Sequence, residues 1–190
     1  MKRLLMIFLA VLMAASAASA QTSGYIGLFV DDTHTSWCGT GFGEAVPLLN
    51  VYVFGLPRAG GTFGAEFMID FPDDPTMITA GATFANDPTV ILGSLSTGVS
   101  LGYDSCITGW FLIATQPMYT TSANRVVVQI VANPSSGGVF FTECEGIRPV
   151  YDAIVFTNVY INYENGVDPE CAETGTAESS WGAIKSMYSE

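Results

Sequence analysis

The stretch IVFTNVYINY, residues 154–163, is the segment most typical of a long β-strand in this chain. Side chains alternate between the two faces of an extended strand. One face is mostly apolar and carries Val155, Thr157, Val159, Ile161 and Tyr163. The other is half-apolar and carries Ile154, Phe156, Asn158, Tyr160 and Asn162. At about 3.3 Å per residue the stretch spans roughly 33 Å, which predicts a strand inside a sheet that is covered on at least one face.

Turn residues divide the rest of the chain into further short strands. The clearest is 62–71, TFGAEFMIDF, with Phe63, Ala65, Phe67, Ile69 and Phe71 on one apolar face. Other strands are expected near residues 24–30, 47–56, 77–79, 82–85, 89–92, 98–103, 107–116, 125–132 and 139–142. The loop NPSSGG, 133–138, predicts a hairpin between the last two. About eight to ten strands without a strong helix predict an all-β, antiparallel β-sandwich, with a β-barrel as the alternative.

The first 20 residues have the pattern of a signal peptide. A basic start, Met1 to Arg3, precedes an apolar run from Leu4 to Met13, and Ala18 to Ala20 has the small residues of a cleavage site. We therefore predict a secreted protein, extracellular or periplasmic, with no transmembrane segment in the mature chain. The β-sandwich domain is expected over 21–168.

The last segment, 169–190, is expected to be an acidic tail. Trp181, Ile184 and Tyr188 stand at i, i+3 and i+7, which favours a short helix, and a docked extended tail is the alternative. Trp181 is the residue that we expect to anchor this tail on the sandwich.

The charge balance excludes one class of partner. The mature chain keeps four basic residues against 18 acidic ones, for a net charge of −14. Binding of DNA, RNA or anionic lipid through phosphates requires clustered Lys and Arg, so no nucleic-acid partner is expected. Like charges would also keep this apolar protein dispersed.

Four cysteines in an exported chain predict two disulfides. They are Cys38, Cys106, Cys144 and Cys171, and three pairings are open. We favour Cys38–Cys106 with Cys144–Cys171, because the second bond would fix the C-terminal segment to the strand before it. The wide spacings argue against a zinc site or a CxxC redox motif.

Clusters of polar side chains were considered as catalytic sites. Asp31, Asp32, His34 and Ser36 lie close in sequence, whereas triad members normally converge from separate parts of a fold. Glu66 and Asp70 would stand ~13 Å apart on one strand face, too far for a glycosidase pair, and the ~6.6 Å between Glu143 and Glu145 would be permissible. Solvated loops and faces explain both groups, so no catalytic residue is expected.

Binding chemistry was considered in the same way. Calcium takes several carboxylate oxygens, and the loops offer Asp31, Asp32, Asp70, Asp73, Asp74 and Asp87. The aromatic residues Trp37, Trp110, Trp181, Tyr103 and Tyr119 could form a sugar-stacking platform. We expect Trp37 to pack on a disulfide and Trp110 to lie in the core, and we predict no cofactor and no metal.

The segment ESSWGAIKSMY, 178–188, resembles a segment of uncharacterised secreted β-sandwich proteins of environmental bacteria. In longer relatives a similar S-W-G-x-I-K-x-L/M-Y segment precedes an immunoglobulin-like or sorting-type domain. The stretches YIGLFVDDTHTSWC, AEFMIDFP, IVFTNVYINY and DPEC are also similar to those proteins. The resemblance brings no activity and no functional residues. The chain ends at Glu190, which favours a freely secreted protein over a surface-displayed one.

The sequence therefore predicts a secreted, non-catalytic structural or interaction module with a protein or glycan partner. A carbohydrate- or calcium-dependent binding domain is the alternative.

Overall fold

The computed structural model describes residues 23–39, 48–73, 77–120, 124–145, 149–163 and 167–171 of the 190-residue chain. Within these residues the regular structure is all β-strand, and no helix that could cross a membrane is present. The thirteen strands are β1 (Gly24–Phe29), β2 (Cys38–Gly39), β3 (Leu48–Leu56), β4 (Thr62–Asp70), β5 (Met77–Thr79), β6 (Thr83–Phe84), β7 (Val90–Ser94), β8 (Gly98–Ile107), β9 (Phe111–Thr120), β10 (Val126–Val131), β11 (Phe140–Glu143), β12 (Val150–Thr157) and β13 (Val159–Ile161). The predicted signal peptide and the tail from residue 172 onward lie outside the described residues.

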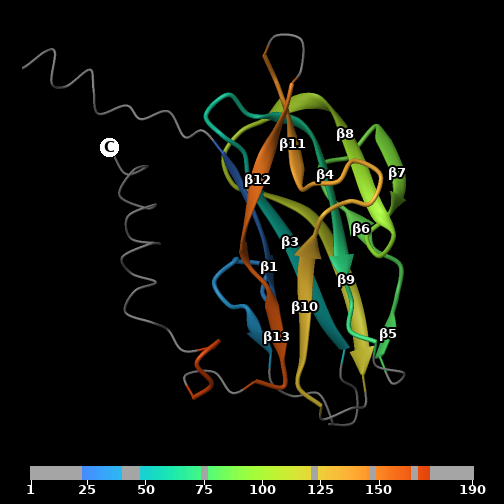
Figure 1. Ribbon diagram of the computed structural model, residues 1–190, viewed down its shortest axis with the longest axis vertical. Coiled ribbons are helices and arrows are strands. Elements are labelled where there is room, and N and C mark those ends of the chain that lie inside the picture. The colour runs from blue at the N-terminus through green and yellow to red at the C-terminus, as the bar shows by residue number, and fades with distance from the viewer. Residues whose placement is uncertain are drawn as a thin grey trace, which may run out of the picture.

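All thirteen strands belong to one hydrogen-bonded path. The path starts at β7 and runs through β8 to β4. It continues from β4 through β10 and β11 to β12 and β13, and from there through β1 and β3 to β9. β5 and β6 both pair with β9. The path folds over on itself, so that β7, β8, β4, β10 and β11 form one layer and β1, β3 and β9 form the other (Figure 1). Over the described residues its two ends do not pair with each other, so the fold is the predicted β-sandwich and not the barrel.

Three positions in the sheet are each occupied by two consecutive strand segments, which a loop or a kink separates: β10 with β11, β12 with β13, and β1 with β2. β10 and β11 both pair antiparallel with β4, at Met68 to Asp70 and at Thr62 to Glu66, so they continue each other in one direction. β12 and β13 likewise continue each other with a break at Asn158, and β1 and β2 pair parallel with them. The strand predicted over 154–163 is therefore two strands, and the sheet is mixed.

The hairpin predicted at 133–138 is wrong. β11 does not return beside β10 but continues past it along β4. The loop closes on itself, because the main-chain N–H of Asn133 donates to the carbonyl of Gly138 at 2.9 Å and that of Gly137 donates to the carbonyl of Asn133 at 2.7 Å. A turn-forming sequence brings the two ends of the loop together. That geometry fits a hairpin, and it fits equally well a loop that bulges out between two consecutive segments of one strand.

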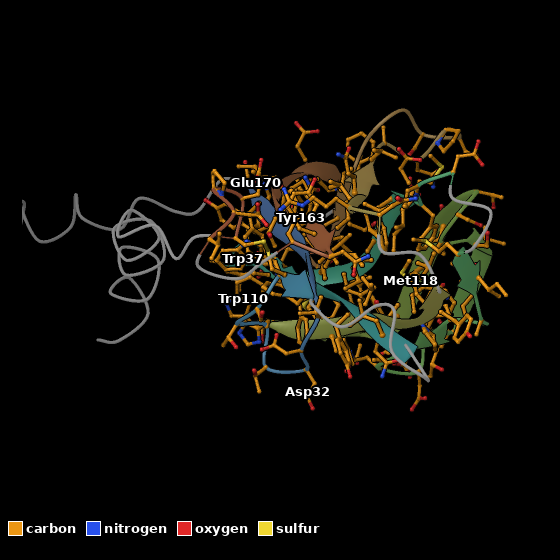
Figure 2. The ribbon with its side chains drawn as sticks, turned by 90° about the horizontal axis from the view of Figure 1, so that it is seen from below. Asp32, Trp37, Trp110, Met118, Tyr163 and Glu170 are labelled. Carbon is orange, nitrogen blue, oxygen red and sulfur yellow. A yellow bond between two sulfur atoms is a disulfide. The ribbon has the colours of Figure 1, made fainter. Side chains whose placement is uncertain are left out.

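The core lies between the two layers and comes from alternate positions of the strands. Ala65, Phe67 and Ile69 of β4 are buried, as the strand pattern predicts, and so are Val159 and Ile161 of β13. Met118 of β9 is also fully buried and lies within the sandwich (Figure 2). The faces turned away from this core are the ones available for function.

A candidate protein-docking face

The outer face of β7, β8, β4, β11 and the start of β12 is partly apolar. Two neighbouring rows of residues cross it in register. We call this surface the glycine face, and its rows are Val90, Gly102, Gly64, Thr142 and Val150, and Leu92, Ser100, Glu66, Phe140 and Asp152. Five strands at about 4.8 Å spacing place Val90 and Val150 ~19 Å apart.

Exposed aliphatic side chains stand at both sides of this face. Leu92 is 64% exposed and Val90 is 47% exposed on β7, and Val150 of β12 is 54% exposed. Between them lie two adjacent residues without side chains, Gly102 and Gly64. These glycines let the strands pack closely, because a Cβ at the buried Gly64 would lie 2.4 Å from the carbonyl oxygen of Leu101 and one at Gly102 would lie 3.3 Å from the Cβ of Val90. A partner would therefore contact the exposed aliphatic side chains of this face.

A flap formed by residues 133–138 closes one end of the glycine face. The flap connects β10 to β11 and crosses β4 toward β8 (Figure 1). The buried Asn133 holds it there, because its Nδ2 donates to the carbonyl of Val99 at 3.1 Å and its Oδ1 accepts from the N–H of Ser135 at 2.9 Å. Gly98 is also required, since a Cβ at that position would lie 2.7 Å from Asn133 Oδ1.

The Cys106–Cys144 disulfide closes the other end of the face. Its Cα atoms are 5.7 Å apart. Glu143, next to Cys144, forms an ion pair with Arg58, whose guanidinium carbon lies 4.3 Å from the centre of the Tyr151 ring. Cys106 lies in β8 and Cys144 directly follows β11, and these two strands flank β4 on its two sides, so the bond crosses the chain just before β4 begins.

The pairing that we favoured from the sequence is therefore wrong, although all four cysteines are in disulfides. The second bond is Cys38–Cys171, with Cα atoms 5.8 Å apart. Cys144 does not bond to Cys171 in the C-terminal segment, because β11 places Cys144 beside Cys106 at the start of β4. Cys38 forms the bond to Cys171 instead, since β2, which contains Cys38, lies at the edge of the sheet next to β13.

The residues around Cys171 are held by two further interactions. The indole Nε1 of Trp37 donates to the carbonyl of Glu170 at 3.0 Å, and both residues lie on the same side of the sandwich (Figure 2). Asp168 is buried and forms an ion pair with Arg125 at 2.8 Å. Trp37 thus supports the segment 167–171 beside the disulfide of its neighbour Cys38. Trp181 lies outside the described residues.

The polar loop 31–36 is organised by one carboxylate. Asp31 accepts hydrogen bonds from the N–H groups of Thr35, at 2.9 Å, and Ser36, at 3.1 Å, and from the hydroxyl of Thr33 at 2.8 Å. Burial alone would raise the pKa of Asp31, but the hydrogen bond from the hydroxyl of Thr35, together with these bonds, outweighs it and holds that pKa below its usual 3.8. The carboxylate is used to shape the loop.

His34 packs among aromatic rings on the outer side of the second layer. Its ring stacks on Trp110 with 5.1 Å between centroids, and it lies 4.9 Å from Phe54 and 5.9 Å from Phe29. Trp110 also meets Phe156 edge-on at 5.7 Å. Trp110 is thus half-buried in a small outer cluster, and its predicted place in the core is wrong. The turn before β9 places it outside the sandwich, over the strands whose inner side chains fill the core.

The other carboxylates considered from the sequence are separated by the fold. Glu66 lies on the glycine face opposite Phe140, and Asp70 lies at the end of β4 opposite Gln129. Glu143 forms an ion pair with Arg58. Asp87 occupies the turn before β7 with a φ of 44°. Among the described residues, no three His, Cys, Asp or Glu side chains are grouped closely enough to hold a metal ion. Asp74 lies outside them.

The two tyrosines considered with the tryptophans lie apart from each other. Tyr103 points from β8 into the core, where its hydroxyl is buried without a hydrogen-bond partner, and burial raises its pKa. Tyr119 lies on β9, opposite Ile78 of β5. No sugar platform joins these residues with Trp37 and Trp110.

The sequence reading missed the glycine face, whose only signal was an apolar strand, 89–92, followed by a Gly-rich one.

Comparison with known proteins identifies the fold. No family model matches the chain, and no curated protein matches it. The cohesin module of a family 33 glycoside hydrolase from Clostridium perfringens is similar in structure, with a TM-score of 0.54 and 13% identity over 76% of this chain and 100% of that one. The second type II cohesin of the ScaA scaffoldin from Acetivibrio cellulolyticus has a TM-score of 0.52 and 13% identity, over 76% of this chain and 99% of that one.

A third similar structure was solved with its partner. It is the sixth cohesin of scaffoldin B from Acetivibrio cellulolyticus in complex with the Cel5 dockerin, with a TM-score of 0.51 and 15% identity over 75% of this chain and 100% of that one. At these identities the likeness shows the fold alone. The chain has the β-sandwich of cohesin modules.

Proposed function

We propose that the chain is a secreted, non-catalytic module that binds another protein through the glycine face. The observation that carries this proposal is the face itself: three exposed aliphatic side chains, Val90, Leu92 and Val150, stand on one outer face of the sheet. Patches of this kind on a soluble protein mark interaction sites. The fold supports the same class of function, since a structural neighbour was solved in complex with a dockerin.

The charges on the face define the partner further. Phe140 lies between two carboxylates, because Glu66 pairs with it from β4 and Asp152 pairs with it from β12. An apolar side chain of the partner would rest near Phe140, and flanking Lys or Arg side chains would meet the two acids. The net charge of the chain, −12 over all 190 residues, would attract a basic partner during encounter.

Comparative capture with variant baits tests the proposal. Thr142 lies between Gly64 and Val150 on the glycine face, so Thr142→Arg places a long charged side chain over its middle. Thr115→Arg makes the same change on β9, on the outer side of the opposite layer. Each chain would be used to capture proteins from the culture medium of the source cells.

The expected result is a protein that binds the original chain and the Thr115→Arg chain but not the Thr142→Arg chain. Calorimetry with the purified pair should then show at least a tenfold weaker Kd for Thr142→Arg, about 1.4 kcal/mol. Equal binding of such a protein by all three chains would contradict the assigned face. The absence of any captured protein that survives purification would contradict the function.

Binding of a carbohydrate or calcium is the alternative proposal. Thermal unfolding with calcium and with a panel of polysaccharides separates the two, because a ligand that binds only the folded state raises the Tm. We expect no shift with either, and a reproducible shift would favour the alternative.

A further inference from the structure

β7 is a bare edge of the sheet. It stands at the end of the hydrogen-bonded path and pairs with β8 only, as far as the described residues show. Figure 1 shows no strand beyond it. All five of its residues are exposed. Every second residue of an edge strand directs its N–H and C=O groups away from the sheet, so β7 presents a row of unpaired backbone groups.

Charged residues and proline, which protect many edge strands, are missing from β7, although the strand is short and Gly93 within it has a φ of 83°. Natural edges carry Lys, Pro or inward charges that prevent pairing with another chain. β7 reads VILGS and has no charged residue and no proline. Its three aliphatic residues are consecutive and are exposed by 47% (Val90), 46% (Ile91) and 64% (Leu92).

We infer that β7 pairs antiparallel with β7 of a second copy of this chain. A two-fold axis perpendicular to the sheet at Ile91 places the two Ile91 residues opposite each other and places Val90 of each copy opposite Leu92 of the other. Every cross-strand pair at the centre is then aliphatic, on both faces of the sheet, which is the pairing that stabilises antiparallel strands. The occupant is identified by this self-complementarity.

The charges near the strand permit the same register. The nearest acid before β7 is Asp87, which lies in the turn before the strand and therefore outside the proposed pairing. The remaining repulsion is long-range, because each copy is acidic overall. Salt screens such repulsion, so the dimer should strengthen as salt is added, whereas pairing through opposite charges would weaken.

The dimer would have a consequence for the surface. A two-fold axis perpendicular to the sheet keeps the outer face of each copy on the same side, so the two glycine faces become one continuous surface across the new strand pair. This inference does not depend on the proposed function, because the strand pairing stands whether or not the glycine face binds a partner.

Sedimentation velocity of the oxidised chain, residues 21–190, tests the inference. We expect a concentration-dependent dimer that strengthens between about 0.05 M and about 0.5 M NaCl. Leu92→Lys should weaken it by roughly tenfold or more, because a lysine on an edge opposes pairing. Ile78→Lys is the matched control, since Ile78 is 62% exposed on the terminal strand β5. It should leave the dimer unchanged, and both variants should keep the original Tm.

Cross-linking tests the strand pairing itself. Cα atoms directly opposite in an antiparallel pair are about 4.5–5.5 Å apart, which suits a disulfide. Ile91→Cys should therefore form a covalent dimer on mild oxidation, faster than Ile78→Cys, with the native disulfides intact by peptide mapping. A monomer at all concentrations and salts, equal weakening by the two lysine variants, or equal cross-linking at positions 91 and 78 would each overturn the inference.

Discussion

The side-chain amide of Asn133 donates to the main-chain carbonyl of Val99 at 3.1 Å, although β4 lies between β8, which contains Val99, and the β10 and β11 strands, which the loop containing Asn133 connects. This bond fixes the flap 133–138 across β4 and sets one border of the glycine face. The flap is thus a built part of the face and not a free surface loop.

Removal of the Asn133 side chain should release the flap. Asn133→Ala loses the bonds to Val99 and Ser135 and leaves the buried carbonyl of Val99 unpaired, so we expect a loss of roughly 2–3 kcal/mol in the free energy of unfolding. Amide hydrogen exchange should rise over 133–138. Asn50→Ala is the control, because the side chain of Asn50 donates to the hydroxyl of Tyr52 in its own strand, at 3.4 Å, and does not tie two segments together within the part of the chain that the structure describes. Equal losses in the two variants would contradict the role of Asn133.

Gly61 should tolerate no side chain, whereas its neighbour Gly60 should. A Cβ at Gly61 would lie 2.6 Å from the Sγ of Cys106, and its φ is 78°. At Gly60 the nearest atom would be 3.8 Å away. Gly61→Ala should therefore cost about 2 kcal/mol in urea unfolding, and Gly60→Ala less than about 1 kcal/mol. Equal costs would mean that the disulfide does not crowd this turn.

The two disulfides should differ in their reactivity toward a soluble reductant. Cys106 is exposed and Cys144 half-buried, whereas Cys38 and Cys171 are both buried. Access controls thiol exchange, so mild reduction followed by alkylation and mass spectrometry should label Cys106 and Cys144 first. Labelling of Cys38 and Cys171 first would contradict the burial described here.

The loop 31–36 should make stability depend on acid pH. The pKa of Asp31 is lower in the folded chain than its ordinary value of 3.8. Its contribution is therefore complete above pH 3.8 and is lost as the pH falls through the lower, folded pKa. Asp31→Asn should lower the Tm at neutral pH, and the difference from the original chain should shrink below pH 3.8. A difference in Tm that is constant over this range would contradict the role of the carboxylate.

The hydroxyl of Tyr103 should contribute nothing to stability. It is buried without a partner, so Tyr103→Phe removes an unsatisfied polar group while the ring keeps its edge-on contact with Phe111 at 6.0 Å. Urea unfolding should show equal or higher stability, by up to about 1 kcal/mol. Tyr151→Phe is the comparison, because the Tyr151 hydroxyl donates to the carbonyl of Gly61 and accepts from the N–H of Arg58, both at 3.3 Å. That variant should lose stability, and a loss in Tyr103→Phe would indicate a partner for its hydroxyl.

The sequence by itself determined where most of the strands lie and which of their faces fill the core. Alternation in 62–70 identified the buried side of β4, and the even number of cysteines in a chain with an export pattern predicted disulfides. These features are local, because which face of a strand is apolar depends only on every second residue.

Only the tertiary structure decided which segments became neighbours. It broke the 154–163 stretch at Asn158, turned the 133–138 hairpin into a flap, and paired Cys106 with Cys144 rather than with Cys38. It also brought Gly64 and Gly102 side by side and left β7 as a bare edge. The physical reason is that the order of strands in a sheet follows from how all of them bury their apolar faces together, and no single segment carries that information.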